Sequence, residues 1–139
     1  AAVAAASNDG NTPLFMAAQE GHNDMARVLL AHGAAVDAAS NTGATPLFIA
    51  AQQGHNGMAT LVLAHGAAVA AASNDGNTPL FMAAQEGHND MARVLLAHGA
   101  AVDAASNTGA TPLFIAAQQG HNGMATLVLA HGAAVAAAS

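Results

Sequence analysis

Residues 7–39 read SNDGNTPLFMAAQEGHNDMARVLLAHGAAVDAA, and residues 40–72 repeat this stretch with a few changes. The tetrapeptide Thr-Pro-Leu-Phe begins at intervals of 33 residues, at 12–15, 45–48, 78–81 and 111–114. A fixed period of this length indicates an array of similar structural units, each stacked on the next. We therefore predict one domain over residues 1–139 with four repeats, at 7–39, 40–72, 73–105 and 106–138. Residues 1–6 are interpreted as the tail of a preceding repeat, and Ser139 as the start of a following one.

A longer period lies above this one. Residues 1–73 are identical to residues 67–139, so the full period is 66 residues and contains two different repeats. All Asp, Glu and Arg residues lie in the first and third repeats, which therefore carry the whole net charge of −6. Identity over such a length indicates a recent tandem duplication or a synthetic gene.

The first half of each repeat carries the start and stop signals of a short helix. Thr12 is a residue type that caps helix N-termini, and Pro13 suits the first helical position, where a missing N–H is tolerated. Gly21 is expected to end this helix in the left-handed conformation. The positions of Phe15, Met16 and Met25 are apolar in every repeat and lie at helical spacing, so we expect them to form the core.

The second half of each repeat predicts another helix and then a loop. His22 or Asn23 starts this helix, and Gly33 ends it. The segment 34–44 is rich in Ala, Ser, Asn and Gly and predicts an extended stretch with a tight turn near residues 41–43. Two helices and a turn in each unit predict an all-α repeat solenoid, in which each unit buries its apolar faces against its neighbours.

Composition and charge narrow the classes of function. No run of about 20 apolar residues occurs, so the sequence predicts no membrane-spanning helix. Only Arg27 and Arg93 are fixed cations in a chain of net charge −6, which disfavours binding to nucleic acid. The heptapeptide at 1–7 recurs at 67–73 and 133–139, so a repeat tail explains it better than a targeting segment.

The first repeat resembles the ankyrin-repeat family, whose pattern D-x-x-G-x-T-P-L-H-x-A-A-x-x-G-H…V-x-x-L-L-x-x-G-A-x-V-N-A it follows closely. The resemblance implies stacked helix-turn-helix units with projecting β-hairpin turns and a concave face that binds other proteins. It also implies a non-catalytic, intracellular protein that needs no cofactor. Two positions depart from the pattern: Ser7 stands where the family usually has Asp, and Phe15 stands where it has His.

The family resemblance also implies which residues face a partner. They come from the turn and the first helix of each repeat, on the concave side. The predicted partner-binding residues are Asn8, Asp9, Asn11, Gln19, Glu20, Asn41, Thr42, Gln52, Gln53, Asn74, Asp75, Asn77, Gln85, Glu86, Asn107, Thr108, Gln118 and Gln119.

Eight histidines raise the question of a metal site. Two of them in one repeat, His22 and His32, would lie about 15 Å apart if they were on one helix. Zinc requires ligands that converge within about 2 Å of the ion, so we interpret the histidines as structural residues that cap helices and bridge repeats. The turn at 7–11 lacks the Glu of a calcium loop, and no nucleophile and base are placed for catalysis. We therefore expect no metal and no enzymatic activity.

A second interpretation treats the array as a spacer whose regular stacking is itself the function. Exact repetition favours this interpretation slightly, because binders of irregular targets diversify their exposed positions. Neither end shows a polar capping repeat, so we also expect end-to-end self-association of the chain.

Overall fold

The computed structural model describes residue 3 and residues 5–135; residues 1–2, 4 and 136–139, and with them Ser139, lie outside this part. The described residues form eight α-helices and no strand. The first helices of the repeats are α1 (Pro13–Glu20), α3 (Pro46–Gln53), α5 (Pro79–Glu86) and α7 (Pro112–Gln119). The second helices are α2 (Asn23–Ala31), α4 (Asn56–Ala64), α6 (Asn89–Ala97) and α8 (Asn122–Ala130).

Each first helix begins and ends as its sequence predicts. In α1, the Thr12 hydroxyl oxygen accepts a hydrogen bond of 3.1 Å from the backbone N–H of Phe15. Pro13 is the first helical residue, and Gly21 ends the helix with φ of 74°. Such a positive φ is strained for any residue with a Cβ atom, which explains why glycine stands there. The predictions for this helix are confirmed.

Each second helix begins at the asparagine after the histidine. In α2, His22 precedes the helix and its side chain makes no capping hydrogen bond. At the other end, the Nδ1 atom of His32 lies 2.8 Å from the carbonyl oxygen of Val28, four residues earlier. The histidine that caps a helix is therefore the one at its C-terminus.

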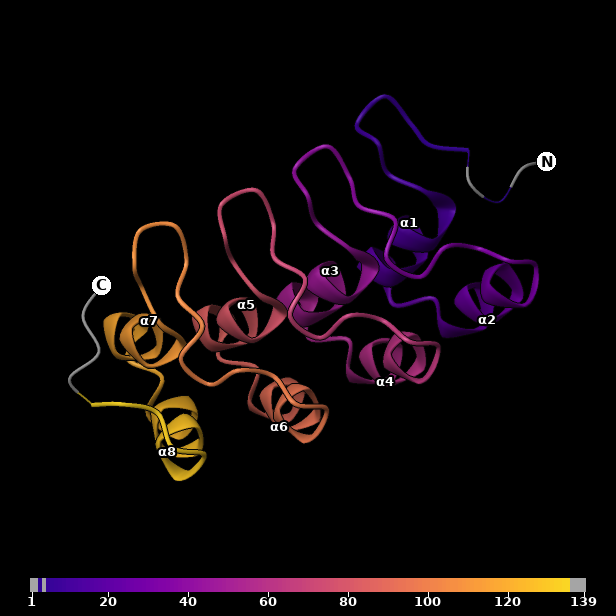
Figure 1. Ribbon diagram of the computed structural model, residues 1–139. Helices are drawn as coiled ribbons and strands as arrows, with labels where there is room; N and C mark the ends of the chain where they lie inside the picture. Colours follow the sequence, from indigo (N-terminus) through magenta and orange to yellow (C-terminus); the bar gives the residue numbers. More distant parts are fainter. Residues whose placement is uncertain (1–2, 4, 136–139) are drawn as a thin grey trace.

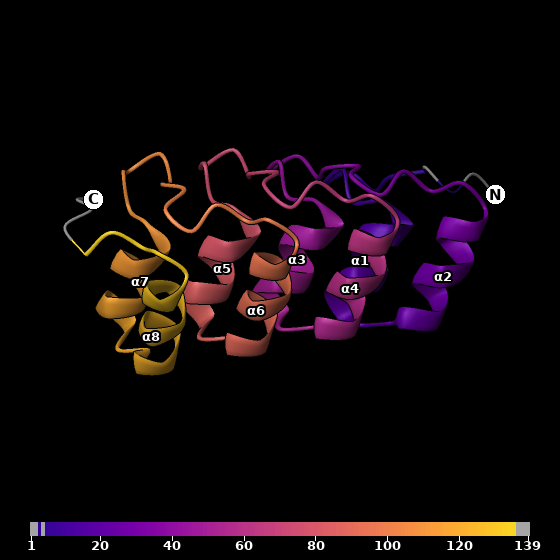
Figure 2. The same cartoon turned by 60° about the horizontal axis from the view of Figure 1, so that its bottom comes forward.

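The helices form two rows along the array. The first helices lie side by side in one row and the second helices in the other (Figure 1). Figure 2 shows the helix pairs in chain order, with the connecting loops along one edge. Alanines such as Ala50 and Ala51 in α3 are completely buried, so α1 and α5 can pack closely on its two sides. The all-α repeat solenoid predicted from the sequence is confirmed.

The expectation that every Phe and Met position is buried is wrong at the two ends. Met16 and Met25 in the first repeat and Phe114 in the fourth are exposed, whereas Met82, Met91 and the other phenylalanines are buried. The physical reason is that each repeat covers these side chains of its neighbour. The first and fourth repeats each lack one neighbour within this chain.

The loops between repeats project from the row of first helices (Figure 1). The loop at 40–44 is closed by two backbone hydrogen bonds of 2.9 Å, from Ser40 N–H to Ala44 O and from Gly43 N–H to Ser40 O. Gly43 has φ of 82°, which allows the tight turn. The expected hairpin turn is thus a short loop held by its own hydrogen bonds.

Candidate interaction surface

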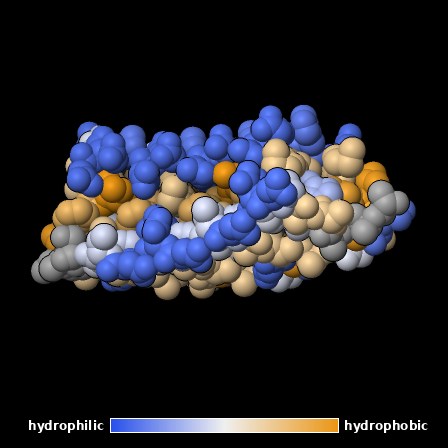
Figure 3. Space-filling view, turned by 90° about the horizontal axis from the view of Figure 1, so that it is seen from above, coloured by the Kyte–Doolittle hydropathy of each residue, from blue (hydrophilic) through white to orange (hydrophobic). Residues whose placement is uncertain are grey.

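The residues predicted to contact a partner lie on the projecting loops and on the first helices. We call this surface the loop face: residues 7–11, 40–44, 73–77 and 106–110, with the Gln and Glu residues near the ends of α1, α3, α5 and α7. Viewed from the side of the loops, hydrophilic residues form two bands along the molecule with less polar surface between them (Figure 3). The loop face therefore extends along the whole array rather than at one point.

The structure brings several predicted residues together between the first two repeats. They surround an open hollow of about 310 Å³ between the two loops, α1 and α3. Its floor includes the buried side chains of Phe15 and Ile49. The polar residues of its rim are Asp9, Asn11, Gln19, Ser40, Asn41 and Thr42. An apolar floor with a polar rim is suited to hold a side chain of another protein.

The asparagines of the loop tips have a structural role that the sequence did not reveal. The side-chain Nδ2 of Asn74 donates a hydrogen bond of 3.0 Å to the backbone oxygen of Asn41 in the preceding repeat. Its backbone N–H donates another, of 2.8 Å, to the oxygen of Thr42. Asn41 and Asn107 make the same two kinds of bond to the repeats before them. These three predicted contact residues therefore join neighbouring loops.

A signal for this role was present in the sequence. The loop-tip asparagine is the same in all four repeats, whereas the next residue is Asp9 or Asp75 in two repeats and Thr42 or Thr108 in the others. A position that stays constant while its neighbour varies is expected where one repeat contacts the next. The Thr residues are also engaged locally, since the hydroxyl of Thr42 lies 2.9 Å from that of Ser40.

Eight of the ten charged residues lie on the loop face or on the second helices, and the other two, Asp37 and Asp103, follow second helices. Arg27 pairs with Asp24 at 2.8 Å and Arg93 with Asp90 at 2.6 Å, both through an i,i+3 contact on an exposed helix surface. Within the described residues, these are the two ion pairs that the arginines form. On the loop face, Asp9, Glu20, Asp75 and Glu86 are exposed. The loop face is therefore acidic at the first and third repeats.

Three histidines link neighbouring repeats. The Nε2 atom of His55 lies 3.1 Å from the backbone oxygen of Gln19, and His88 and His121 make the same contact with Gln52 and Gln85. The acceptor is a carbonyl oxygen, so Nε2 is the protonated nitrogen in each ring. In the part of the chain that the structure describes, no three His, Asp or Glu side chains come together in a way that could hold a metal ion.

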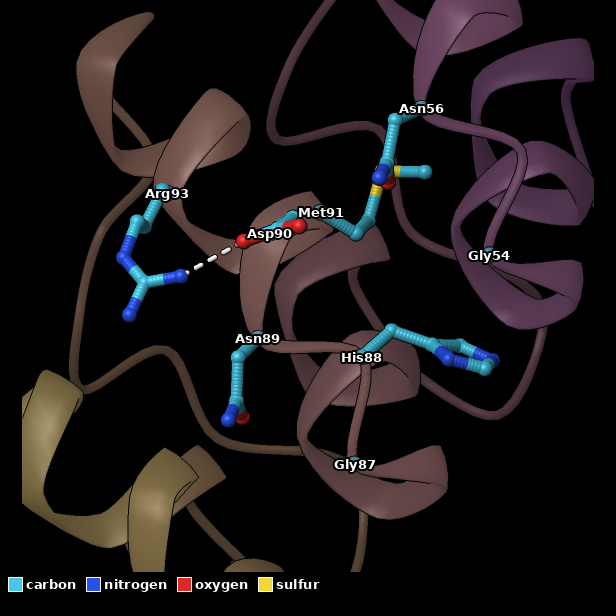
Figure 4. Close-up of a pocket in the computed structure, with 8 residues that line it drawn as sticks. All are labelled: Gly54, Asn56, Gly87, His88, Asn89, Asp90, Met91 and Arg93. Atoms are coloured by element: carbon cyan, nitrogen blue, oxygen red, sulfur yellow. Dashed lines mark hydrogen bonds and ion pairs between the residues drawn. The ribbon is translucent and has the colours of Figure 1, made fainter.

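A second hollow lies at the end of the helices away from the loops. It has a volume of about 400 Å³ and lies between the start of α4 and the start of α6 (Figure 4). Figure 4 shows Arg93 reaching across to Asp90, and His88 directed toward Gly54. Of the side chains that line it, His88 bonds to the Gln52 oxygen and Arg93 pairs with Asp90, and we assign the hollow no role in binding.

None of the described helices is long and apolar enough to cross a membrane. A search of curated proteins found no match to the chain. A family model described as "Ankyrin repeats (3 copies)" matches residues 2–73 and, a second time, residues 68–138. These two matches cover nearly the whole chain and agree with the helix pairs, the Thr-Pro helix starts and the projecting loops. The chain belongs to the ankyrin-repeat family.

Proposed function

We propose that this chain is a non-catalytic scaffold that binds a protein partner through its loop face. Ankyrin repeats are generally protein-interaction modules. The observation that carries the proposal is the hollow between the first two repeats, where Asp9, Asn11, Gln19 and Thr42 surround an apolar floor. The four repeats at 7–39, 40–72, 73–105 and 106–138 would act as one domain, because each buries its apolar faces only against its neighbours.

The charge of the loop face indicates the chemistry of such a partner. Asp9 and Glu20 recur as Asp75 and Glu86 two repeats later. Each repeat advances by about one helix diameter, roughly 10 Å, so the two acidic sites lie about 20 Å apart. Between them the second repeat is polar but uncharged. A protein surface with two basic groups at this separation fits the loop face best.

A pull-down with paired variants tests the proposal. The variant Asp9→Ala/Asp75→Ala removes two carboxylates from the loop face and leaves the asparagine bonds between loops intact. The variant Asp24→Ala/Asp90→Ala is the control, since it removes two exposed carboxylates from the second helices. Proteins captured by the wild type and the control should be lost from the loop-face variant. If all three chains capture the same proteins, this face is not the binding surface.

A structural spacer with no specific ligand is the second candidate, because residues 1–73 and 67–139 are identical. A spacer requires stacking only, so Asp9→Ala/Asp75→Ala should then leave every function of the chain unchanged. Substitutions at the contacts between repeats, such as Met91→Ala, should abolish the spacer function, because they weaken the stacking of the repeats. The two candidates are separated by whether Asp9→Ala/Asp75→Ala loses function in a setting where the chain is needed.

A further inference from the structure

The N-terminal end of the array exposes a surface that is buried elsewhere in the same chain. Repeats one and three have the same sequence, so any difference between them comes from their neighbours. Met25 is 53% exposed, whereas its equivalent Met91 is 0% exposed beneath the second repeat. Met16 is likewise exposed and Met82 buried. The first repeat therefore presents to solvent the surface that the third repeat packs against the second.

The C-terminal end exposes the other half of that interface. Repeats two and four also share one sequence. Leu129 is 41% exposed, whereas its equivalent Leu63 is 8% exposed beneath the third repeat. Phe114 is exposed and Phe48 buried in the same way. The two ends of the array thus carry the two complementary surfaces of one interface that the structure already contains between repeats two and three.

We infer that a second copy of this chain docks on the first head to tail, with its first repeat on the fourth repeat of the other copy. The polarity is fixed, because each end matches the opposite end and not itself. The junction repeats the internal interface between repeats two and three in sequence and in packing. The docking surfaces are the two ends of the array, and their pairing does not depend on what the loop face binds.

The hydrogen bonds expected at this junction follow from the internal interface. His22 of one copy occupies the place of His88, whose Nε2 lies 3.1 Å from the Gln52 oxygen, and would bond to the oxygen of Gln118. Asn8 occupies the place of Asn74 and would donate its side-chain Nδ2 to the oxygen of Asn107. The polar side chains at the N-terminal end of one copy therefore match the backbone oxygens at the C-terminal end of the other.

The junction differs from the internal interface in one respect. The segment Ala-Ala-Val-Ala-Ala-Ala is present once internally, at 67–72, but twice at a junction, at 133–138 of one copy and 1–6 of the other. Val135 is largely exposed in the single chain, whereas Val69 packs against the core. Only one of the two copies of this segment can take the place of 67–72 at a junction, and the exposed Val135 buries little apolar area in the single chain.

A head-to-tail contact between identical chains leaves one free end of each kind after every addition. Such a heterologous contact does not close at a dimer unless the rotation brings the ends together. We therefore expect open chains whose mean length increases with protein concentration. The acidic sites of the loop face would continue through each junction at the same spacing of two repeats, because Asp75 is followed by Asp9 of the next copy after one full period.

Sedimentation velocity of the 139-residue chain, from low to high micromolar concentration, provides the first test. The wild type should show a mass that increases steadily beyond twice the 13.5 kDa of one chain. The variant Met25→Glu places a charge on the N-terminal surface, and Leu129→Glu places one on the C-terminal surface. Both side chains are already partly exposed, so the fold should tolerate these changes, as circular dichroism will check.

Mixing the two variants tests the polarity. Each variant alone keeps only one intact end and should stay monomeric, whereas an equimolar mixture should form a dimer that does not grow further. Ala97→Glu is the control: this alanine is exposed although its repeat has neighbours on both sides, so the variant should associate like the wild type. A monomeric wild type at high micromolar concentration would overturn the inference. Dimers of either single variant would also overturn it, because they would show pairing of like ends.

Discussion

The Nε2 atom of His88 lies 3.1 Å from the backbone oxygen of Gln52, and the imidazole ring packs against Gly54. This contact joins the third repeat to the second through a ring that precedes a helix without capping it. The same contact is made by His55 and His121, so a histidine in each of the last three repeats bonds to the repeat before it, in addition to the asparagine of the loop tip.

The substitution His88→Ala should lower the free energy of unfolding by about 1–2 kcal/mol, since it removes a partly buried hydrogen bond and leaves the Gln52 oxygen without its partner. His22→Ala is the matched control, because His22 has the same local sequence and is exposed. Its effect should stay below about 0.5 kcal/mol. Urea denaturation followed by circular dichroism measures both. Equal losses for the two variants would show that the histidine acts within its own repeat.

Gly54→Ala and Gly120→Ala separate backbone strain from contact between repeats. The two glycines end equivalent helices with φ of 76° and 74°. A Cβ at Gly54 would lie 2.9 Å from the His88 ring, whereas one at Gly120 would meet nothing within 4 Å. Both variants should lose about 1 kcal/mol through the positive φ. Gly54→Ala should lose about 1–3 kcal/mol more because the ring must move. Thermal and urea unfolding of the two proteins at low concentration should show this difference, and its absence would mean that the ring adjusts freely.

Met91→Ala and Met25→Ala test how much of the core is formed between repeats. Met91 is buried, so its truncation should cost about 2–5 kcal/mol. Met25, in an identical sequence, is half exposed in the single chain, and its truncation should cost less than about 1 kcal/mol. The measurement is urea denaturation of dilute samples in which the chain is monomeric. A large loss for Met25→Ala would contradict the exposure of this side chain.

Ala70→Asp should stabilise the array. Asp37 accepts hydrogen bonds from the backbone N–H of Ala68 in the next repeat, at 3.3 and 3.1 Å, and Asp103 does the same for Ala134. Ala70 stands at the equivalent position of the second repeat and offers no acceptor to Ala101. The new carboxylate should supply the missing bond and add about 0.5–1 kcal/mol to the free energy of unfolding. Ala70→Asn, which carries one carbonyl oxygen and no charge, should gain less. A loss of stability in Ala70→Asp would indicate that the two loops do not approach as closely there.

The parts of the fold that local chemistry determines could be predicted from the sequence. Thr12 and Pro13 mark a helix start by themselves, and Gly21 marks its end, so the positions of the helices could be predicted. The period could be predicted because these residues recur every 33 positions. The exposure of Met25 could not be obtained in this way, because an identical residue, Met91, is buried. The difference depends on a neighbouring repeat and not on any nearby residue.

The candidate site was predicted only in part. The resemblance placed Asp9, Gln19 and Thr42 on one face, and the structure brings them to one hollow. It did not reveal that the Asn41 and Asn74 side chains bond to the preceding loop, since asparagine is common in exposed turns for local reasons. Contact of the loop face with a partner stays a prediction.

The missing carboxylate at Ala70 has a mechanical consequence. The boundaries between repeats one and two and between repeats three and four each carry an aspartate bond, and the central boundary carries none. As far as this bond is concerned, the central boundary should resist tension along the axis least, and parting there would give two halves of equal size. Each half would be one 66-residue unit of the sequence. The 66-residue unit that is repeated in the sequence would then also be the unit that separates intact under force.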